Sequence, residues 1–263
     1  MNSILTIAGS DSGAGAGIQA DLKTAMALGV YATTVITALT AQNTVEVRDI
    51  LEVPSSFVSA QLACVFEDLP PDAVKIGMLG TEENILAAAE GLKPFGAKNI
   101  VVDPVLCSTS GRRLLDPAGL EALQNKLFPL ARIITPNVPE AELLWHHKIT
   151  SRREMEQAAE AISNRAGGAA VVVKGGHLTG AADVLFDQNQ ILWFEEKPLK
   201  AFNTHGTGCT LSSAMACFLA KGFTLEESVF RAKQFLTGAI GAGLNLGKGP
   251  GPLHHGYLFS ELL

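Results

Sequence analysis

The sequence predicts an α/β fold in which a mostly parallel β-sheet is covered by helices on both faces, as a three-layer α-β-α sandwich. Short β-branched runs alternate along the chain with longer amphipathic segments. Strands that are apolar throughout are buried on both faces, and their alternation with helices is typical of a parallel sheet. Apolar residues make up 47% of the 263 residues and charged residues only 17%, enough for a large core. Since no linker, repeat or low-complexity segment interrupts the pattern, we expect one domain over residues 1–263.

The first half of the chain alternates strands and helices as a parallel sheet requires. Residues rich in Thr, Val and Ile favour strands, and apolar residues at helical spacing favour helices. The second helix, for example, is predicted from Phe57, Leu62, Val65, Phe66 and Leu69. The predicted order is strand Ser3–Ala8, helix Gly17–Leu28, strand Tyr31–Ala38, edge strand Val45–Val53, helix Ser55–Asp68, strand Ala73–Met78, helix Glu82–Leu92 and strand Asn99–Asp103.

The second half continues the alternation and ends in two apolar helices. A hairpin is expected around Gln188 and Asn189, which separate two short apolar runs. The predicted order is helix Ala118–Leu127, strand Arg132–Thr135, short helix Pro139–Trp145, helix Arg152–Arg165, strand Ala170–Lys174, hairpin strands Val184–Asp187 and Ile191–Phe194, and helices Cys209–Ala220 and Leu225–Leu244.

Composition and charge exclude several classes of protein. The net charge is −6 and no run of Lys and Arg exists, so we expect no nucleic-acid partner. The first residues lack the charged and apolar regions of a secretory signal, which favours a cytoplasmic location. The cysteines are widely spaced without a CxxC pair, which argues against a disulfide scaffold or zinc ribbon. They are Cys64, Cys107, Cys209 and Cys217.

One uncharged stretch, Thr24–Val45, is long enough to span a bilayer. It contains six threonines and a break at Gly29–Tyr31, which favour the end of a helix followed by a buried strand. We therefore expect no membrane partner.

The first of two glycine clusters runs from Gly9 to Gly17, after the first strand. Its spacing does not match the dinucleotide fingerprint GxGxxG, and the chain has no GxxxxGK[ST] loop. A dinucleotide-dependent oxidoreductase is therefore disfavoured. A packing turn and a ligand-binding loop remain equally good interpretations of this cluster.

The second cluster, Gly206-Thr207-Gly208-Cys209, opens an apolar helix. The first N–H groups of a helix have no partner within it, so they form an anion site that glycines leave accessible to a phosphate. Cys209 lies in the first turn, where the helix dipole is expected to lower the pKa of a thiol. The alternative is a buried structural cysteine, which is our interpretation of Cys64 and Cys217.

Polar residues follow several predicted strands, at the edge where parallel sheets bind ligands. They are Asp11, Asp103, Asn137 and Lys174. Lys174 is interpreted either as a phosphate ligand or as a solvated lysine. Glu140 is either a helix-capping carboxylate or, with Asp103, a ligand of phosphate-bound magnesium. The six histidines show no metal-ligand spacing.

Nine segments together resemble one family. They are LTIAGSDSGAGAGIQADLKT, VITALTAQNT, KIGML, VVDPV, STSG, ITPNVPEA, VVVKGGH, NTHGTGCTLSSA and GPGPLHH. In this order they resemble the hydroxymethylpyrimidine/phosphomethylpyrimidine kinases of thiamine biosynthesis, in the ribokinase-like superfamily. The resemblance runs from residue 4 to about residue 255. It implies a ribokinase-like fold and transfer of the ATP γ-phosphate, with Mg²⁺, to 4-amino-5-hydroxymethyl-2-methylpyrimidine and then to its monophosphate.

The resemblance also implies roles for individual residues. Gln42 would hydrogen-bond the aminopyrimidine, with four residues around the ring: Gly9, Asp21, Met78 and Val105. The ATP contacts would come from Asn137, Lys174, Thr207 and Gly208, and Asn137 would also lie beside the magnesium ligands Asp103 and Glu140. The amides of Gly206, Thr207 and Gly208 would stabilise the transferred phosphoryl group. Cys209 stands where the wider superfamily has an aspartate as general base. The resemblance further suggests a homodimer, for which the Val45–Val53 edge is a plausible interface.

Two departures and two alternatives keep the prediction open. Asp11-Ser12-Gly13-Ala14-Gly15 replaces the Asp-Pro-Ser-Gly-Gly that the family often has, so a more mobile loop is expected. Leu106-Cys107 stands where the family often has Met and a small residue, at a position expected to shape the pocket. A pyridoxal kinase shares the fold and offers a similar substrate. A non-catalytic pyrimidine-binding sensor is the alternative outside the enzymes.

Overall fold

The computed structural model describes residues 1–106, 115–176, 182–196 and 203–262. Within them, one nine-stranded sheet has the order β3-β2-β1-β4-β5-β6-β7-β8-β9. The pairs from β2 to β7 are parallel, whereas β3, β8 and β9 are antiparallel to their neighbours. The strands are β1 Ser3–Asp11, β2 Tyr31–Gln42, β3 Val47–Glu52, β4 Ala73–Ile76, β5 Ile100–Val102, β6 Ile133–Ile134, β7 Ala170–Lys174, β8 Ala182–Asp187 and β9 Gln190–Glu195.

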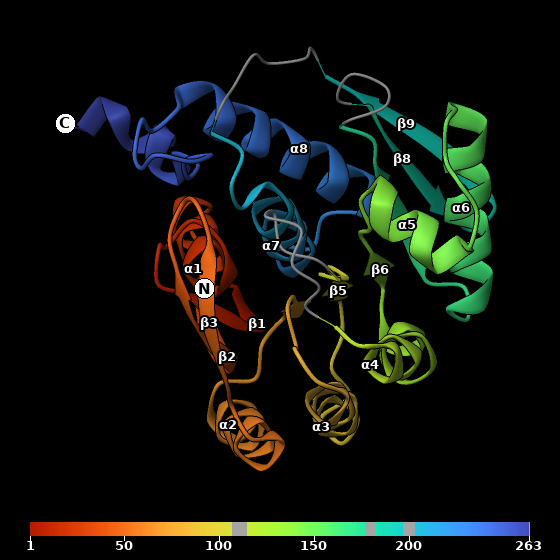
Figure 1. Cartoon of the computed structure of the whole chain (residues 1–263), viewed down its shortest axis with the longest axis horizontal. Coiled ribbons are helices and arrows are strands. Elements are labelled where there is room, and N and C mark those ends of the chain that lie inside the picture. Colours follow the sequence, from red (N-terminus) through yellow and green to blue (C-terminus); the bar gives the residue numbers. More distant parts are fainter. Residues whose placement is uncertain (107–114, 177–181, 197–202, 263) are drawn as a thin grey trace.

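Helices cover both faces of the sheet and bury two separate cores (Figure 1). One core lies between the sheet and α2, α3, α4, α5 and α6, and the other lies beneath α1, α7 and α8. The three-layer sandwich predicted from the sequence is therefore confirmed. The helices are α1 Gly17–Ala27, α2 Ser55–Asp68, α3 Glu82–Leu92, α4 Pro117–Ala122, α5 Val138–Trp145, α6 Arg152–Arg165, α7 Thr207–Ala220 and α8 Leu225–Ala242.

Every predicted strand and helix is present, with two differences near helix ends. The predicted helix Ala118–Leu127 is α4 followed by a π-helical turn, Leu123–Leu127, and a 3₁₀ turn, Phe128–Leu130. Pro129 lies in the 3₁₀ turn and has no N–H to donate, so an α-helix could not continue regularly through this position. A 3₁₀ segment at His255–Leu262 was not predicted, because the Gly- and Pro-rich residues before it are typical of a loop.

The uncharged stretch Thr24–Val45 forms the end of α1 and the strand β2, as expected. Among the helices that the structure describes, none combines the length and the apolar character needed to cross a bilayer.

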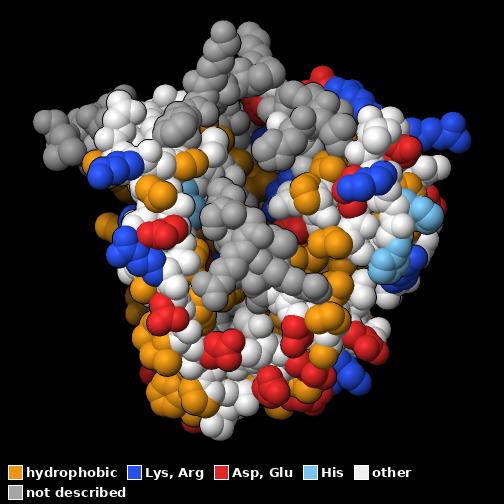
Figure 2. All heavy atoms as spheres, viewed as in Figure 1, with side chains coloured by type: hydrophobic (Ala, Val, Ile, Leu, Met, Phe, Trp, Pro, Cys, Tyr) orange, Lys and Arg blue, Asp and Glu red, His pale blue; other side chains and the backbone are white. Residues whose placement is uncertain are grey.

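The edge strand β3 lies beside a hydrophobic surface. Leu51 of β3 is 67% exposed and Phe57 of α2 is 60% exposed. Figure 2 shows hydrophobic side chains gathered at the lower left of the molecule, where α2 lies. Both the backbone edge and these side chains are available for contact with another molecule.

A fully buried ion pair joins four elements at the centre of the molecule. The Nζ atom of Lys75, on β4, lies 2.8 Å and 2.9 Å from the carboxylate oxygens of Asp21, on α1. Neither side chain has any exposed surface. The same carboxylate accepts hydrogen bonds from the hydroxyl groups of Thr6 on β1 and Ser213 on α7. Burial opposes the charged form of Lys75, but the pKa of this ammonium is raised because Asp21 lies against it.

We expect Lys75→Met to lower the free energy of unfolding by about 3–5 kcal/mol, because the Asp21 carboxylate would remain buried without its cationic partner. Urea unfolding followed by circular dichroism measures the change. The control is Lys93→Met, which breaks the exposed pair between Lys93 and Glu90 and is expected to change stability little. Equal losses in the two variants would contradict this account of the buried pair.

Candidate active site

Most of the polar residues singled out in the sequence meet at the carboxyl ends of the parallel strands. Asp11 ends β1, Asp103 follows β5, Asn137 follows β6 and Lys174 ends β7. The N-terminus of α7 faces the same edge, because a methyl group on Gly208 would lie 3.3 Å from Asp103 Oδ2 and 3.4 Å from Lys174 Nζ. The structure therefore brings together the two glycine clusters and the charged residues, as predicted for a ligand site.

Two glycines let the start of α7 lie against the first glycine-rich loop. Gly206 has a φ of +87°, and a methyl group there would overlap the carbonyl oxygen of Gly15. A methyl group on Gly15 would in turn overlap the ring of His205. The α7 helix then begins at Thr207, so its first N–H groups, those of Gly208 and Cys209 included, have no partner within the helix. This is the geometry of an anion site.

The charged end of the site centres on the ion pair between Lys174 and Asp103. Lys174 Nζ lies 2.8 Å from Asp103 Oδ1, and the hydroxyl of Thr135 donates to the same oxygen at 3.2 Å. The hydroxyl of Ser212 on α7 lies 3.4 Å from Asp103 Oδ2. Burial opposes the charged form of Lys174, but Asp103 and Glu140 raise the pKa of this ammonium. Lys174 therefore stays positively charged at neutral pH.

A second buried ion pair shapes the turn that follows Lys174. Asp183 on β8 lies 2.5 Å from Lys233 Nζ on α8, and both side chains are nearly inaccessible. The other carboxylate oxygen of Asp183 accepts the N–H of Gly175 at 3.0 Å. The residue after Lys174 is thus tied to the neighbouring strand β8, which helps to hold β7 at the site.

Glu140 caps α5 and also faces the charged end of the site. The Glu140 carboxylate accepts the N–H of Asn137 at 2.9 Å, and the Asn137 side chain accepts the N–H of Glu140 at 2.9 Å. This capping box confirms the structural interpretation of the Asn-x-x-Glu motif. Burial raises the pKa of Glu140 to about 7; Lys174 opposes the shift and Asp103 adds to it. The role of Glu140 in magnesium binding stays a prediction.

The donor set of Asp103 and Glu140 fits a magnesium ion that also binds phosphate. In the described part of the chain, no group of three or more His, Cys, Asp and Glu side chains is placed to hold a metal ion. Asp103 and Glu140 interact electrostatically with each other and with Lys174. Carboxylate oxygens are preferred ligands of Mg²⁺, which binds through one or two of them when phosphates supply the rest.

The thiol of Cys209 does not have the lowered pKa that its place at a helix N-terminus predicts. Burial raises the pKa of Cys209 to about 11. Lys75 opposes this shift, whereas the carboxylates of Asp21 and Asp103 add to it. Desolvation and two nearby negative charges therefore outweigh the helix dipole. The thiol is protonated at neutral pH in this structure.

The other cysteines divide into three cases. Cys217 is buried, as expected for a structural cysteine, and burial raises its pKa to about 12. The same expectation was wrong for Cys64, whose side chain is exposed on α2 because it lies off the apolar face of that helix. Cys107 lies outside the described residues.

The residues expected around a pyrimidine ring separate into two groups. Gly9 lies next to Met78, since a methyl group on Gly9 would be 3.4 Å from the Met78 sulfur. Val105 follows Asp103 and is half-buried, and Gln42 ends β2. Asp21 is different, because its carboxylate is fully buried and contacts Lys75 rather than the open edge of the sheet. Nothing in the sequence near Asp21 indicated Lys75 as its partner, because Lys75 lies 54 residues further along the chain.

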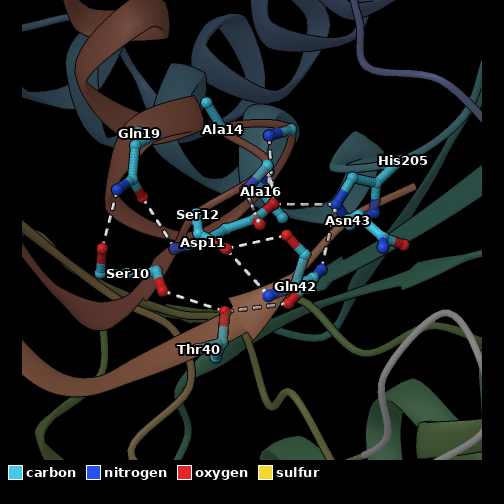
Figure 3. A network of polar contacts seen from close by, with 12 residues as sticks. Ser10, Asp11, Ser12, Ala14, Ala16, Gln19, Thr40, Gln42, Asn43 and His205 are labelled. Atoms are coloured by element: carbon cyan, nitrogen blue, oxygen red, sulfur yellow. Dashed lines mark hydrogen bonds and ion pairs between the residues drawn. The ribbon is translucent and has the colours of Figure 1, made fainter. Parts of the chain in front are cut away.

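A network that the sequence did not predict surrounds Gln42 (Figure 3). His205 Nε2 lies 3.0 Å from Asp11 Oδ2 and 3.2 Å from Gln42 Nε2. Figure 3 shows the His205 ring pointing toward both side chains. The only sequence signal for His205 was its place immediately before the Gly206–Cys209 cluster.

Ser12 holds the backbone of Gln42 where the family often has a proline. Its hydroxyl donates to the Gln42 carbonyl and accepts the Gln42 N–H, both at 2.8 Å. The glycine-rich loop is thereby tied to the end of β2. These bonds supply a restraint that the expectation of a more mobile loop did not include.

The contact between α7 and the loop predicts different effects of alanine at two glycines. Gly206 and Gly222 have nearly the same φ, +87° and +84°, but Gly222 has open space around it. We expect Gly222→Ala to lower the free energy of unfolding by about 1–2 kcal/mol, the cost of the left-handed backbone. Gly206→Ala should lower it by about 1–3 kcal/mol more, because the added methyl overlaps Gly15. Urea unfolding measures both, and equal losses would contradict the close contact.

Known proteins resemble this chain over nearly its whole length. A model of the phosphomethylpyrimidine kinase family matches residues 11–254. The hydroxymethylpyrimidine/phosphomethylpyrimidine kinase of Rhizobium meliloti is 52% identical over 256 residues, which cover 95% of this chain and 96% of the relative. A thiamine biosynthesis bifunctional protein of Geobacter sulfurreducens is 48% identical over 96% of this chain, which spans 52% of that longer protein.

Solved structures show the same architecture. A crystal structure of phosphomethylpyrimidine kinase from Clostridium difficile matches with a TM-score of 0.82 at 45% identity, covering 91% of this chain and 100% of the other. An ADP complex of Bacillus subtilis pyridoxal kinase matches with a TM-score of 0.92 at 37% identity, covering 99% of each chain. The ribokinase-like fold expected from the motifs is thus confirmed. The chain belongs to the phosphomethylpyrimidine kinase family.

Proposed function

We propose that this chain, as one domain over residues 1–263, uses ATP to phosphorylate 4-amino-5-hydroxymethyl-2-methylpyrimidine and then its monophosphate, for thiamine biosynthesis. The observation that carries the proposal is the meeting of the Lys174–Asp103 ion pair, at 2.8 Å, with the start of α7 at Gly208. A lysine, a carboxylate and helix N–H groups that have no partner within the helix are what phosphoryl transfer uses when they meet at one place. Membership in the family supports the choice of substrate.

The phosphate chain of ATP is proposed to lie between Lys174 and the start of α7. The N–H groups of Gly206, Thr207 and Gly208 would stabilise the negative charge on the transferred phosphoryl group. Lys174 supplies a permanent positive charge on the other side, and Asn137 lies beside it, since the two residues form a bridge between their backbones. Because these groups are fixed before the reaction, little reorganisation is needed.

Asp103 and Glu140 are the proposed holders of magnesium. When bound, the ion would neutralise charge on the phosphates. On the protein's side, Thr135 orients the Asp103 carboxylate, and the N–H of Asn137 orients that of Glu140. Lys174 contacts Asp103, so its positive charge partly balances the negative charges of the Asp103 and Glu140 carboxylates.

Cys209 is the proposed general base for the hydroxymethyl group. It would accept the hydroxyl proton at its sulfur as the oxygen attacks phosphorus, so the thiolate must form first. Burial raises the pKa of Cys209 to about 11, and the charge of Lys75 acts in the opposite direction. In the second reaction the nucleophile is a phosphate that is already ionised. That step needs no proton acceptor and should depend less on Cys209.

We expect Cys209→Ala to slow the first phosphorylation by about 10²–10⁴-fold, the usual contribution of a general base, and the second by less. Each step is measured separately, starting from the pyrimidine or from its monophosphate. Cys217→Ala is the control, because it removes a buried thiol from the same helix, away from the start of α7. Equal losses in the two steps would rule out the base role.

Two observations favour pyridoxal kinase activity as the second candidate. The match to the Bacillus subtilis pyridoxal kinase has the TM-score of 0.92, and pyridoxal also carries a hydroxymethyl group on an aromatic ring. Gln42 and Cys209 favour the pyrimidine, by the family resemblance.

The decisive test offers both rings in parallel to the purified protein with ATP and magnesium. Products are followed by mass spectrometry over time. We expect the monophosphate of the pyrimidine and then its diphosphate. Pyridoxal phosphate alone would overturn the proposed substrate, and binding of the pyrimidine without any product would support the sensor.

We further propose that two copies of the chain associate through the surface at β3 and α2. Within the described residues, strand β3 pairs only with β2, and Leu51 and Phe57 are exposed beside it. Light scattering on the purified protein tests this proposal. A mass near 27.6 kDa would contradict it, and twice that mass would support it.

A further inference from the structure

We propose that His205, held by Asp11, sets the orientation of the Gln42 side-chain amide and so decides which way round the pyrimidine ring binds. This inference rests on the proposed kinase function and deepens it by naming positioning residues for the substrate. It is carried by the juxtaposition of His205, Asp11, Gln42 and Thr40 at the ends of β1 and β2 (Figure 3).

The contact with Asp11 determines where the His205 ring carries a proton. An ionised carboxylate accepts hydrogen bonds but cannot donate them. The Asp11 carboxylate accepts the N–H groups of Gly13, Gly15 and Ala16 at 2.8–3.1 Å. Burial opposes its ionisation, but His205 and these N–H groups lower the pKa of Asp11. The 3.0 Å contact is therefore attractive only when His205 Nε2 carries a hydrogen.

A protonated His205 Nε2 requires an acceptor on Gln42. The group now placed 3.2 Å from His205 Nε2 is the Gln42 nitrogen, so two N–H donors would face each other. Rotating the amide by half a turn exchanges its oxygen and nitrogen with almost no change of shape. The Gln42 oxygen then accepts the His205 proton, which it shares with Asp11.

The other side of the amide leads independently to the same orientation. The Thr40 hydroxyl lies 3.1 Å from the Ser10 carbonyl and 3.2 Å from the Gln42 oxygen, which are two acceptors for one proton. With the amide turned, the Gln42 nitrogen donates to the Thr40 oxygen, and the Thr40 proton goes to Ser10. Each donor in the contacts among His205, Gln42, Thr40 and Ser10 then faces an acceptor.

The orientation is set before any substrate binds. Asp11 is fixed by three N–H groups, and the His205 ring lies against Gly15, where a methyl group would overlap it. Ser12 holds the backbone of Gln42 through two bonds. The terminal amide of Gln42 could otherwise still rotate, and its contacts with His205 and Thr40 prevent that rotation.

The fixed amide presents one remaining acceptor site and one remaining N–H in a fixed order. An aminopyrimidine edge offers the complementary pair, an amino donor beside a ring-nitrogen acceptor. Turning the ring over exchanges these two groups and moves the neighbouring hydroxymethyl group to the opposite side. A fixed Gln42 therefore accepts one ring direction and places the hydroxymethyl group on one side.

The protonation of His205 is tested first on the free protein, by ¹⁵N spectra of histidine-labelled chain. The His205→Phe variant identifies the signal that disappears. We expect a hydrogen on Nε2 at neutral pH. A neutral ring with its hydrogen on Nδ1 alone would overturn the proposal, whatever the activity of the protein.

The effect on substrate is tested through Thr40, which lies away from the start of α7. Thr40→Val removes the hydroxyl at nearly constant shape, and Thr40→Ser keeps it. We expect Thr40→Val to raise the KM for the pyrimidine roughly 10-fold, the effect of one lost hydrogen bond, while the KM for ATP stays within about twofold. Thr40→Ser should restore the wild-type value, and His205→Phe should change the pyrimidine KM in the same direction.

Three results would count against the role of His205 and Thr40. The first is an unchanged pyrimidine KM in Thr40→Val, and the second is an equal rise of the pyrimidine KM and the ATP KM in that variant. The third is a pyrimidine KM in Thr40→Ser that stays above the wild-type value. Turnover by the wild-type chain is measured beforehand and tests the proposed function separately. If the wild type does not turn over, titration calorimetry with the same pyrimidine gives dissociation constants for the same comparison.

Discussion

The chain can start α7 where it does only because Gly206 and Gly15 lack side chains. Their contact places the first turn of the helix against the glycine-rich loop, and both functional ends of the site follow from it. His205, the residue before Gly206, then faces Gln42 at the end of β2. Three residues later, Gly208 faces Asp103 and Lys174. One close backbone contact thereby fixes the spacing between the proposed pyrimidine and phosphate positions.

Two buried ion pairs beside α7 have different consequences. Asp21 and Lys75 have no exposed surface, and their additional hydrogen bonds tie α1, β1, β4 and α7 together. Lys174 and Asp103 lie at the open edge of the sheet, where Lys174 keeps 14% of its side-chain surface exposed. The first pair is suited to holding the helix in place, and the second to exchanging partners when a phosphate enters.

Much of this arrangement could be predicted from local sequence. Hydrophobic periodicity located the strands, and the polar residues at their ends, such as Lys174, pointed to the ligand edge. Properties that depend on distant partners could not be predicted. The pKa of Cys209 depends on burial and on the carboxylates of Asp21 and Asp103, so the helix dipole alone indicated the wrong direction. The family resemblance placed Asp21 near the pyrimidine, but the contact between Asp21 and Lys75 could not be predicted. The contacts of His205 with Asp11 and Gln42 could not be predicted either.

The central claim is that the start of α7 joins the two ends of the site. The measurement that tests it most directly is a crystal structure of the chain with hydroxymethylpyrimidine, magnesium and a non-hydrolysable ATP analogue. The account predicts that the γ-phosphate lies on the N–H groups of Gly206–Gly208, with the hydroxymethyl oxygen between it and Cys209. A γ-phosphate bound away from this turn, with the helix N–H groups facing only water, would contradict it.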